Sequence, residues 1–245
     1  MAGPKRLRLL HTSDVHIGDE NYPLLRLAGL TAAVDAAIEA SVDGVLIAGD
    51  LFDSARVKPH EVEAAWAQLA RMPAPVVLIP GNHDCLGPPS IYSRITHTDA
   101  GEHVYFISEP DGEYLTLHEL GLTVWARGMV EHFPANFPLR GHQPLEDGNW
   151  QVVMAHGHYL PDGEETYRSS PIPEQQLGEL DCDYVALGHW HRFEDVSVNG
   201  TKAFYCGSPA EPGMAEASAN LVTLDPHSGI TVERIPLPKY EGPMR

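Results

Sequence analysis

Aspartate, asparagine and histidine side chains gather in five short clusters, each directly after an apolar run. The clusters are Asp14-x-His16, Gly49-Asp50-x-x-Asp53, Gly81-Asn82-His83-Asp84, His156-Gly157-His158 and Gly188-His189-Trp190-His191. Oxygen and imidazole donors without thiolates suit divalent cations. A carboxylate has two oxygens and can bridge two cations, which imidazole and amide groups do not do easily. The clusters therefore predict a pair of divalent ions, with Asp50 as the bridge.

The charge of such a site indicates its ligand. Asn82 is a neutral donor, so two cations held by ionised Asp14 and Asp50 together with a hydroxide keep a net positive charge. Two neighbouring cations polarise phosphoryl oxygens, lower the pKa of a shared water and clamp the attacking and leaving oxygens of an in-line displacement. We therefore expect the site to bind and hydrolyse a phosphate ester.

The apolar runs that precede the clusters predict strands. They cover residues 7–10, 45–48, 76–79, 152–155 and 184–187. Continuous apolar runs are typical of strands buried on both faces. Because ligand sites in open α/β sheets lie outside the carboxyl ends of the strands, we expect the five clusters to converge.

Other segments complete an α/β pattern. One apolar stripe predicts a helix over residues 24–38, and residues 61–71 predict a second helix. Shorter strands are expected over 104–127 and 193–236. Two Pro-containing and Gly-containing regions, 131–149 and 158–173, are expected to be long loops, which in compact domains are usually functional or disordered.

Composition excludes some classes of protein. The 245 residues include 34 acidic and 16 basic residues, for a formal charge of −18. This charge opposes polybasic binding to nucleic acid or to anionic membranes. No apolar run is long enough for a signal peptide or a membrane span. The three cysteines form no Cys-x-x-Cys pair, which favours a reducing, cytoplasmic compartment; Cys85 is notable because it follows the third cluster.

The five ordered clusters resemble the motifs of the calcineurin-like metallophosphoesterase superfamily. The phrases 11–18, 49–53, 183–189 and 205–209 are similar, more narrowly, to the SbcD-type DNA-repair exonuclease branch. The resemblance covers about residues 7–210. It implies a four-layer α/β/β/α sandwich, with two mixed β-sheets flanked by helices, in a single domain over 1–245 that a β-hairpin at about 218–236 closes.

The resemblance also implies individual roles. It assigns Asp14, His16 and His191 to one ion, Asn82, His156 and His189 to the other, and Asp50 to both. It makes His83 a non-ligand histidine that protonates or hydrogen-bonds the leaving alkoxide, and it makes Asp53 the carboxylate that accepts a hydrogen bond from the His83 ring. Mn²⁺ is the implied metal, with Fe, Zn²⁺ and Co²⁺ as alternatives.

Further side chains near the clusters are candidate substrate contacts. They are His158, Arg127, Arg168 and Asp84. Trp190 lies between two expected ligands, and strand alternation predicts that it points away from the ions and packs against the protein.

We expect phosphodiester hydrolysis by attack of the bridging hydroxide on nucleotidic or small phosphodiesters or on short or single-stranded nucleic-acid ends. The chain stops soon after the phosphoesterase core, so neither the capping domain nor the ATPase-docking segment of the nuclease relatives is expected. A phosphomonoesterase of the same fold and a catalytically silent metal-binding scaffold are the alternatives. The oligomeric state is left open.

Overall fold

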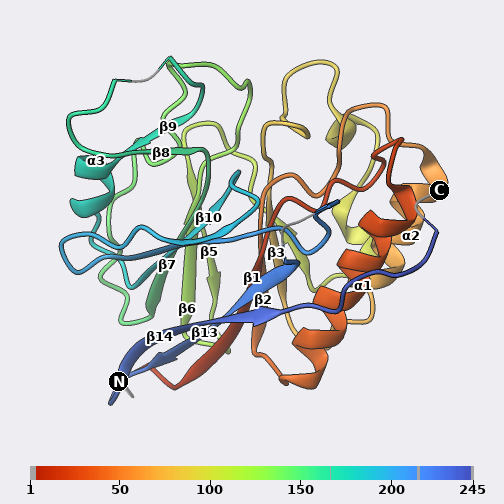
Figure 1. Cartoon of the computed structure of the whole chain (residues 1–245). Helices are drawn as coiled ribbons and strands as arrows, with labels where there is room; N and C mark the ends of the chain where they lie inside the picture. Colours follow the sequence, from red (N-terminus) through yellow and green to blue (C-terminus); the bar gives the residue numbers. More distant parts are fainter. Residues whose placement is uncertain (1–3, 166, 214–215, 244–245) are drawn as a thin grey trace.

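The computed structural model describes residues 4–165, 167–213 and 216–243. The first sheet contains six strands in the order β14 (Gly229–Pro236), β13 (Ser218–Asp225), β1 (Leu7–Thr12), β2 (Gly44–Ala48), β3 (Val76–Ile79) and β4 (Val104–Phe106) (Figure 1). The strands from β1 to β4 are parallel to their neighbours, whereas β13 pairs antiparallel with both β1 and β14.

The second sheet also contains six strands. Their order is β11 (Phe193–Asp195), β12 (Lys202–Cys206), β10 (Tyr184–Gly188), β7 (Trp150–His156), β6 (Leu122–Ala126) and β5 (Glu113–Leu117). The four inner strands are parallel and the two outer strands are antiparallel to them. The segments β8 (His158–Leu160) and β9 (Pro171–Pro173) form a separate two-stranded sheet.

Helices cover the outer faces of the two sheets unequally. Helices α1 (Pro23–Glu39) and α2 (Pro59–Leu69) lie beside the first sheet, and each begins with proline, whose missing N–H costs nothing in the first turn (Figure 1). The second sheet has the five-residue helix α3 (Glu174–Gly178) on its outer side. Two short 3-10 helices, Ile91–Ser93 and His97–Ala100, lie between β3 and β4.

Strand alternation sorts the apolar side chains into three layers. Leu10, Val45 and Ile47 pack toward α1 and α2, whereas their neighbours Leu9 and Leu46 pack against the second sheet. Fully burying one such side chain stabilises the fold by about 1.5–3 kcal/mol. The same alternation in β7 and β10 sends alternate residues outward, where α3 and loop residues cover them.

The structure therefore confirms the expected α/β fold with two mixed sheets. The fourth layer is thin, because α3 is short and loops do most of the covering. The predicted hairpin over 218–236 is β13 and β14. The loop expected over 158–173 is partly wrong, because β8 and β9 pair there. In the described part of the chain, no helix is both long enough and apolar enough to cross a membrane.

Candidate metal centre

The five sequence clusters meet at one end of the two sheets. They follow β1, β2 and β3 of the first sheet and β7 and β10 of the second, and all of these strands end toward the same edge. The expected convergence follows from this parallel arrangement. The site lies where loops from the two sheets face each other.

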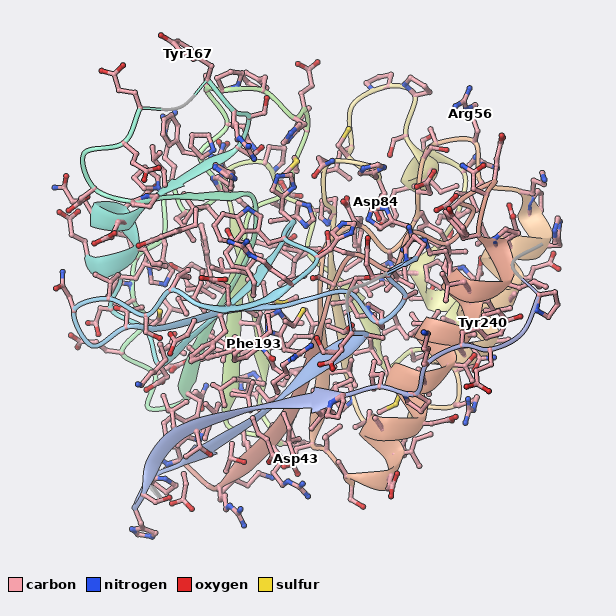
Figure 2. The ribbon with its side chains drawn as sticks, in the orientation of Figure 1. Asp43, Arg56, Asp84, Tyr167, Phe193 and Tyr240 are labelled. Carbon is pink, nitrogen blue, oxygen red and sulfur yellow. The ribbon has the colours of Figure 1, made fainter. Side chains whose placement is uncertain are left out.

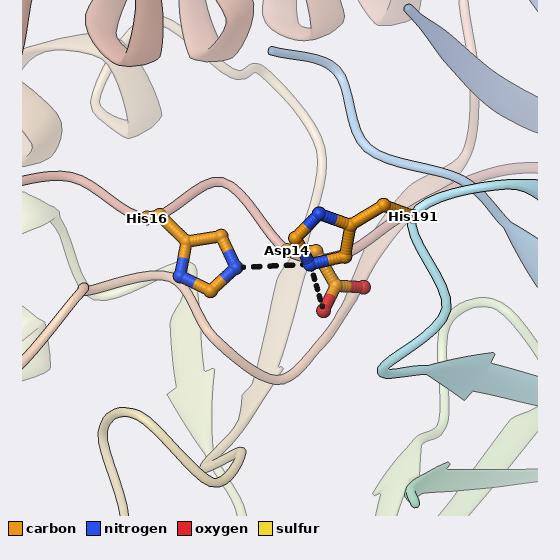
Figure 3. A group of neighbouring side chains, drawn as sticks. All are labelled: Asp14, His16 and His191. Atoms are coloured by element: carbon orange, nitrogen blue, oxygen red, sulfur yellow. Dashed lines mark hydrogen bonds and ion pairs between the residues drawn. The ribbon is translucent and has the colours of Figure 1, made fainter. Parts of the chain in front are cut away.

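Asp14, His16 and His191 form one group, which we call the first ligand group (Figure 3). His191 Nε2 lies 3.6 Å from Asp14 Oδ1 and 3.3 Å from His16 Nε2. Within the described structure, the buried Oδ1 of Asp14 has no hydrogen-bond partner. A buried carboxylate oxygen without a donor, with two imidazole nitrogens beside it, fits a cation.

Asn82, His156 and His189 lie together as candidate ligands of a second ion, and we call them the second ligand group. Asn82 Oδ1 lies 2.9 Å from His156 Nε2 and 2.9 Å from His189 Nδ1. The other ring nitrogen of His156, Nδ1, donates to the Ala48 carbonyl at 2.8 Å. This hydrogen bond fixes the ring, so that Nε2 is the atom that points toward the centre.

Asp50 lies between the two groups. Its Oδ2 is 3.3 Å from His156 Nε2 and 3.9 Å from His16 Nε2. Its Oδ1 accepts a hydrogen bond from the main-chain N–H of His83 at 2.8 Å. One carboxylate therefore approaches a member of each ligand group, which is the position that a bridging ligand requires.

The loops that carry these residues have uncommon backbone angles. Asp14, His16, Asp50 and His189 have φ values of 56°, 58°, 54° and 108°. Aspartate and histidine adopt such angles more readily than most residues, but the strain persists only where the surroundings enforce it, often at functional sites. Asp14 and His16 both reach the first ligand group, although they lie beyond the end of β1 and have positive φ angles.

Close packing around the second cluster requires glycine. Gly49 has φ +89°, and a Cβ there would lie 2.3 Å from His156 Nδ1. Main-chain bonds from Asp14 N to the Gly49 carbonyl (3.1 Å) and from His16 N to the Asp50 carbonyl (3.0 Å) join the first two loops. Because Gly49 has no side chain, the loops of Asp14 and Asp50 and the His156 ring can pack in close contact.

Buried charges shift the acidity of the ligand rings. Burial by itself would lower the pKa of His156, but the charge of Asp50 and the hydrogen bond to it raise this pKa to about 10. Burial and the charged His156 ring together lower the pKa of His189 to about 3. The buried negative charge of Asp50 is balanced by a positive His156 ring, and a divalent cation would balance the same charge.

His83 lies beside His16 and Asp50 and reaches solvent, with 44% of its side chain exposed. Its Nδ1 donates to the main-chain carbonyl of Asp53 at 3.0 Å. The expected bond to the Asp53 carboxylate is therefore replaced: that carboxylate lies 3.7 Å from His83 Nδ1 and 3.5 Å from His16 Nδ1. Since a carbonyl only accepts, Nδ1 carries a proton and Nε2 remains for a substrate.

Two expected substrate contacts take structural roles. Asp84 is 1% exposed and accepts hydrogen bonds from the Gly81 and Phe52 N–H groups and the Tyr92 hydroxyl, so it organises the loop from inside (Figure 2). Burial and the nearby Asp50 charge raise its pKa to about 6. Arg127 donates to the carbonyls of Pro110 and Phe137 and thereby joins two loops.

A hollow of about 590 Å³ adjoins the site. It is lined by His158, Arg168, His189, Trp190, His191, Arg192 and Glu211. Trp190 stacks on Tyr205 with ring centroids 4.6 Å apart, in the packing role expected of it. Its indole N–H donates to His158 Nδ1 at 3.1 Å, so a neutral His158 ring carries its proton on Nε2.

Sequence reasoning missed two neighbours of the ligands. Glu211 Oε2 lies 2.6 Å from His191 Nδ1, and the His132 ring lies 5.6 Å from the His189 ring. His132 Nδ1 is 3.1 Å from the Ser170 hydroxyl, which joins the two long loops. The available signals were the family-like phrase 205–209 just before Glu211 and the length of the loop that carries His132.

Residues 7–193 match the family described as calcineurin-like phosphoesterase. The chain belongs to this family. Its family membership makes it a hydrolase, a metallophosphoesterase, and the described residues include groups that could hold a divalent metal.

Known proteins with related sequences include a nuclease subunit and a DNA double-strand break repair protein. The chain is 29% identical over 258 residues to the SbcD component of the nuclease SbcCD of Bacillus subtilis, covering 89% of the chain and 66% of the relative. It is 28% identical over 229 residues to the DNA double-strand break repair protein Mre11 of Methanopyrus kandleri, covering 83% and 49%. The metallophosphoesterase chain thus spans about half to two thirds of the length of these relatives.

A solved structure supports the fold. The purple acid phosphatase PPD1 from yellow lupin seeds superposes with a TM-score of 0.62 at 14% identity, covering 95% of this chain and 52% of that one. At this identity the likeness supports the metallophosphoesterase architecture of two packed sheets, and nothing about substrate.

Proposed function

We propose that this metallophosphoesterase hydrolyses phosphodiester bonds at a centre of two divalent ions. The observation that supports this proposal is the position of Asp50, whose Oδ2 lies within 3.9 Å of a ring nitrogen from each ligand group. One ion would be held by Asp14, His16 and His191, the other by Asn82, His156 and His189, with Asp50 shared.

The donor set fits several metals. Imidazole nitrogen together with carboxylate and amide oxygen suits Mn²⁺, Fe, Zn²⁺ or Co²⁺, and availability decides among them more than affinity does. We propose Mn²⁺. Two such ions, when bound, supply an activated water nucleophile and polarise the phosphoryl oxygens.

His83 would act on the leaving group. Its Nδ1 is held by the Asp53 carbonyl, so Nε2 is the ring nitrogen left to deliver a proton to the departing alkoxide. The Asp53 carboxylate lies 3.7 Å from His83 Nδ1. General acid catalysis of this kind contributes about 10²–10⁴-fold.

The hollow beside His189 and His191 would receive one ester arm. His158 lies in its wall, and Arg168 and Arg192 are exposed residues that line it. Arginine binds phosphate through two parallel N–H groups, so a substrate with a second phosphate fits this hollow. The formal charge of −18 opposes long polyanions, which favours nucleotides, small phosphodiesters and short or single-stranded nucleic-acid ends.

We also propose that residues 1–245 form one domain, because both sheets share the core between them. The free cysteines Cys85, Cys182 and Cys206 support a reducing compartment such as the cytoplasm.

A substrate panel tests the proposal. Bis-p-nitrophenyl phosphate, p-nitrophenyl phosphate, cyclic nucleotides and single- and double-stranded DNA are assayed with Mn²⁺, Zn²⁺, Co²⁺ and Fe²⁺. We expect the diester to exceed the monoester in kcat/KM. A reversed preference would identify a phosphomonoesterase, and no turnover with any metal would identify a silent scaffold. Tight duplex binding with a log–log salt slope near −0.9 per phosphate contact would overturn the preference for small substrates.

A further inference from the structure

The segment after β12 touches the first ligand group from behind. Glu211 lies on this segment, and its Oε2 is 2.6 Å from Nδ1 of His191. Both side chains are largely covered, with exposed fractions of 23% for Glu211 and 35% for His191. The ordinary roles of a surface carboxylate therefore do not describe Glu211.

Hydrogen bonds hold the segment to helix α1 and to the loop of Asp14. Arg26 of α1 is 6% exposed and donates to the Ala210 carbonyl at 2.5 Å, while the Asp19 carboxylate holds the same guanidinium at 3.0 Å. The Ser208 hydroxyl donates to the Asp14 carbonyl at 2.7 Å. Helix and segment are in close contact, because a Cβ at Gly29 would lie 2.4 Å from the Ala210 Cβ.

The contact fixes which nitrogen of His191 faces the ligands. An ionised carboxylate only accepts, so Nδ1 of His191 carries the proton that it donates to Glu211. The lone pair of a neutral ring then lies on Nε2, which is the atom 3.3 Å from His16 Nε2 and 3.6 Å from Asp14 Oδ1. Outer partners of this kind orient metal-ligating histidines and increase their basicity.

The second ligand group has a different outer partner. His156 Nδ1 donates to a neutral main-chain carbonyl, that of Ala48, at 2.8 Å. A carbonyl fixes the ring but adds no full charge. The negative charge of Glu211 therefore lies behind the first group.

We infer that Glu211 is a positioning residue for the ion held by Asp14, His16 and His191, and that Arg26 holds the segment that carries it. The inference rests on the proposed two-ion centre. Glu211 fixes the ring and tautomer of His191 and adds a negative charge to this side of the site. Outer partners of metal ligands typically change metal affinity by about 10–100-fold.

The experiment measures Mn²⁺ binding to the metal-free full chain by titration calorimetry, with electron paramagnetic resonance to count free Mn²⁺. We expect Glu211→Ala to raise the dissociation constant of one ion by about 10–100-fold and to leave that of the other unchanged. Glu211→Gln keeps an acceptor for His191 Nδ1 but loses the charge, so it should restore part of the affinity. The matched control is Glu216→Ala, because Glu216 is 75% exposed and pairs only peripherally, with Arg234 at 3.2 Å.

Unchanged constants for both ions in Glu211→Ala, or equal weakening of both, would overturn the positioning role. If Glu211→Ala does not fold, Glu211→Gln provides the test. Weaker binding of one Mn²⁺ ion supports the positioning role, and wild-type dissociation constants for both ions would overturn it. A wild-type chain that binds fewer than two ions contradicts the proposed function itself, and that result is known before any variant is measured.

Discussion

The two ligand groups differ in charge and in what holds them. The first group contains the carboxylate of Asp14 and has the carboxylate of Glu211 behind His191, whereas the second group is an amide and two imidazoles with a carbonyl behind His156. Asp50 lies between the groups, and Asp14 also approaches the second group, because its Oδ2 accepts a hydrogen bond from the His189 main-chain N–H at 3.0 Å. Because negative charge is concentrated on one side, we expect the first group to hold a divalent ion more tightly than the second.

The largest effect is expected from the residue common to both groups. Asp50→Asn removes the central charge but keeps an oxygen that can accept from the His83 N–H. We expect binding of fewer than two Mn²⁺ ions per chain and a loss of turnover greater than the roughly 10–100-fold cost of losing an outer partner. Metal analysis after gel filtration and turnover of bis-p-nitrophenyl phosphate provide the measurement. Two ions bound with wild-type affinity would show that Asp50 does not join the groups.

A residue outside both groups should separate chemistry from metal binding. We expect His83→Gln to bind two ions normally and to lose about 10²–10⁴-fold in kcat, because no group then protonates the leaving alkoxide. The loss should be greater for a diester with an alkyl leaving group than for one with p-nitrophenolate, which leaves without a proton. Wild-type turnover of both diesters would refute the assigned role.

Exchanging charge between the groups should reduce the difference between their affinities for a divalent ion. Asp14→Asn removes the charge of the first group, and Asn82→Asp adds one to the second. We expect the first change to weaken the tighter ion by about tenfold or more, and the second to narrow the gap between the two dissociation constants. Calorimetric titration with Mn²⁺ measures both. If neither substitution changes the ratio of the constants, charge is not what distinguishes the groups.

The smallest effect is expected on the pH dependence of folding stability, through His11 in strand β1, which leads to the first ligand group. His11 at the end of β1 lies 2.8 Å, through Nδ1, from the Tyr184 hydroxyl of β10, and burial lowers its pKa to about 3. In the unfolded chain His11 has a pKa near 6.5, so below this pH it binds a proton that it does not bind in the folded chain. The stability that depends on neutral His11 is therefore complete above pH 6.5 and is lost as the pH falls toward 3.

Urea unfolding of the metal-free chain at pH 7 and pH 5 measures this loss. The free energy of unfolding should fall by about 2 kcal/mol more in the wild type than in His11→Gln, whose side chain does not titrate. His227→Gln, in the exposed turn between β13 and β14, serves as the control. Equal losses in the wild type and His11→Gln would contradict the buried, neutral state of His11.

The sequence was most informative where contacts are local. Each strand that precedes a cluster is an unbroken apolar run, and parallel pairing places its carboxyl end beside the others, so the convergence of Asp50, Asn82 and His156 could be predicted. The positive φ angles at Asp14 and His16 could not, because the main-chain hydrogen bonds made there join residues of a neighbouring loop, Gly49 and Asp50.

Long-range contacts explain the remaining differences. The sequence around Asp84 does not indicate that the Phe52 N–H and the Tyr92 hydroxyl donate hydrogen bonds to its carboxylate. Glu211 contacts His191 from a segment whose Ala210 carbonyl accepts a hydrogen bond from Arg26, on a helix far away in sequence. Periodicity and motif spacing describe neighbours along one element, whereas these contacts depend on how separate elements pack.

A stepwise titration of the metal-free chain with Mn²⁺, following bound metal and hydrolysis of bis-p-nitrophenyl phosphate in the same samples, tests the two-ion phosphodiesterase most directly. The two ligand groups joined by Asp50 predict two bound ions per chain, with turnover appearing as the second, weaker ion binds. Saturation at one ion, or saturation at two ions without hydrolysis of the diester, would contradict the two-ion phosphodiesterase.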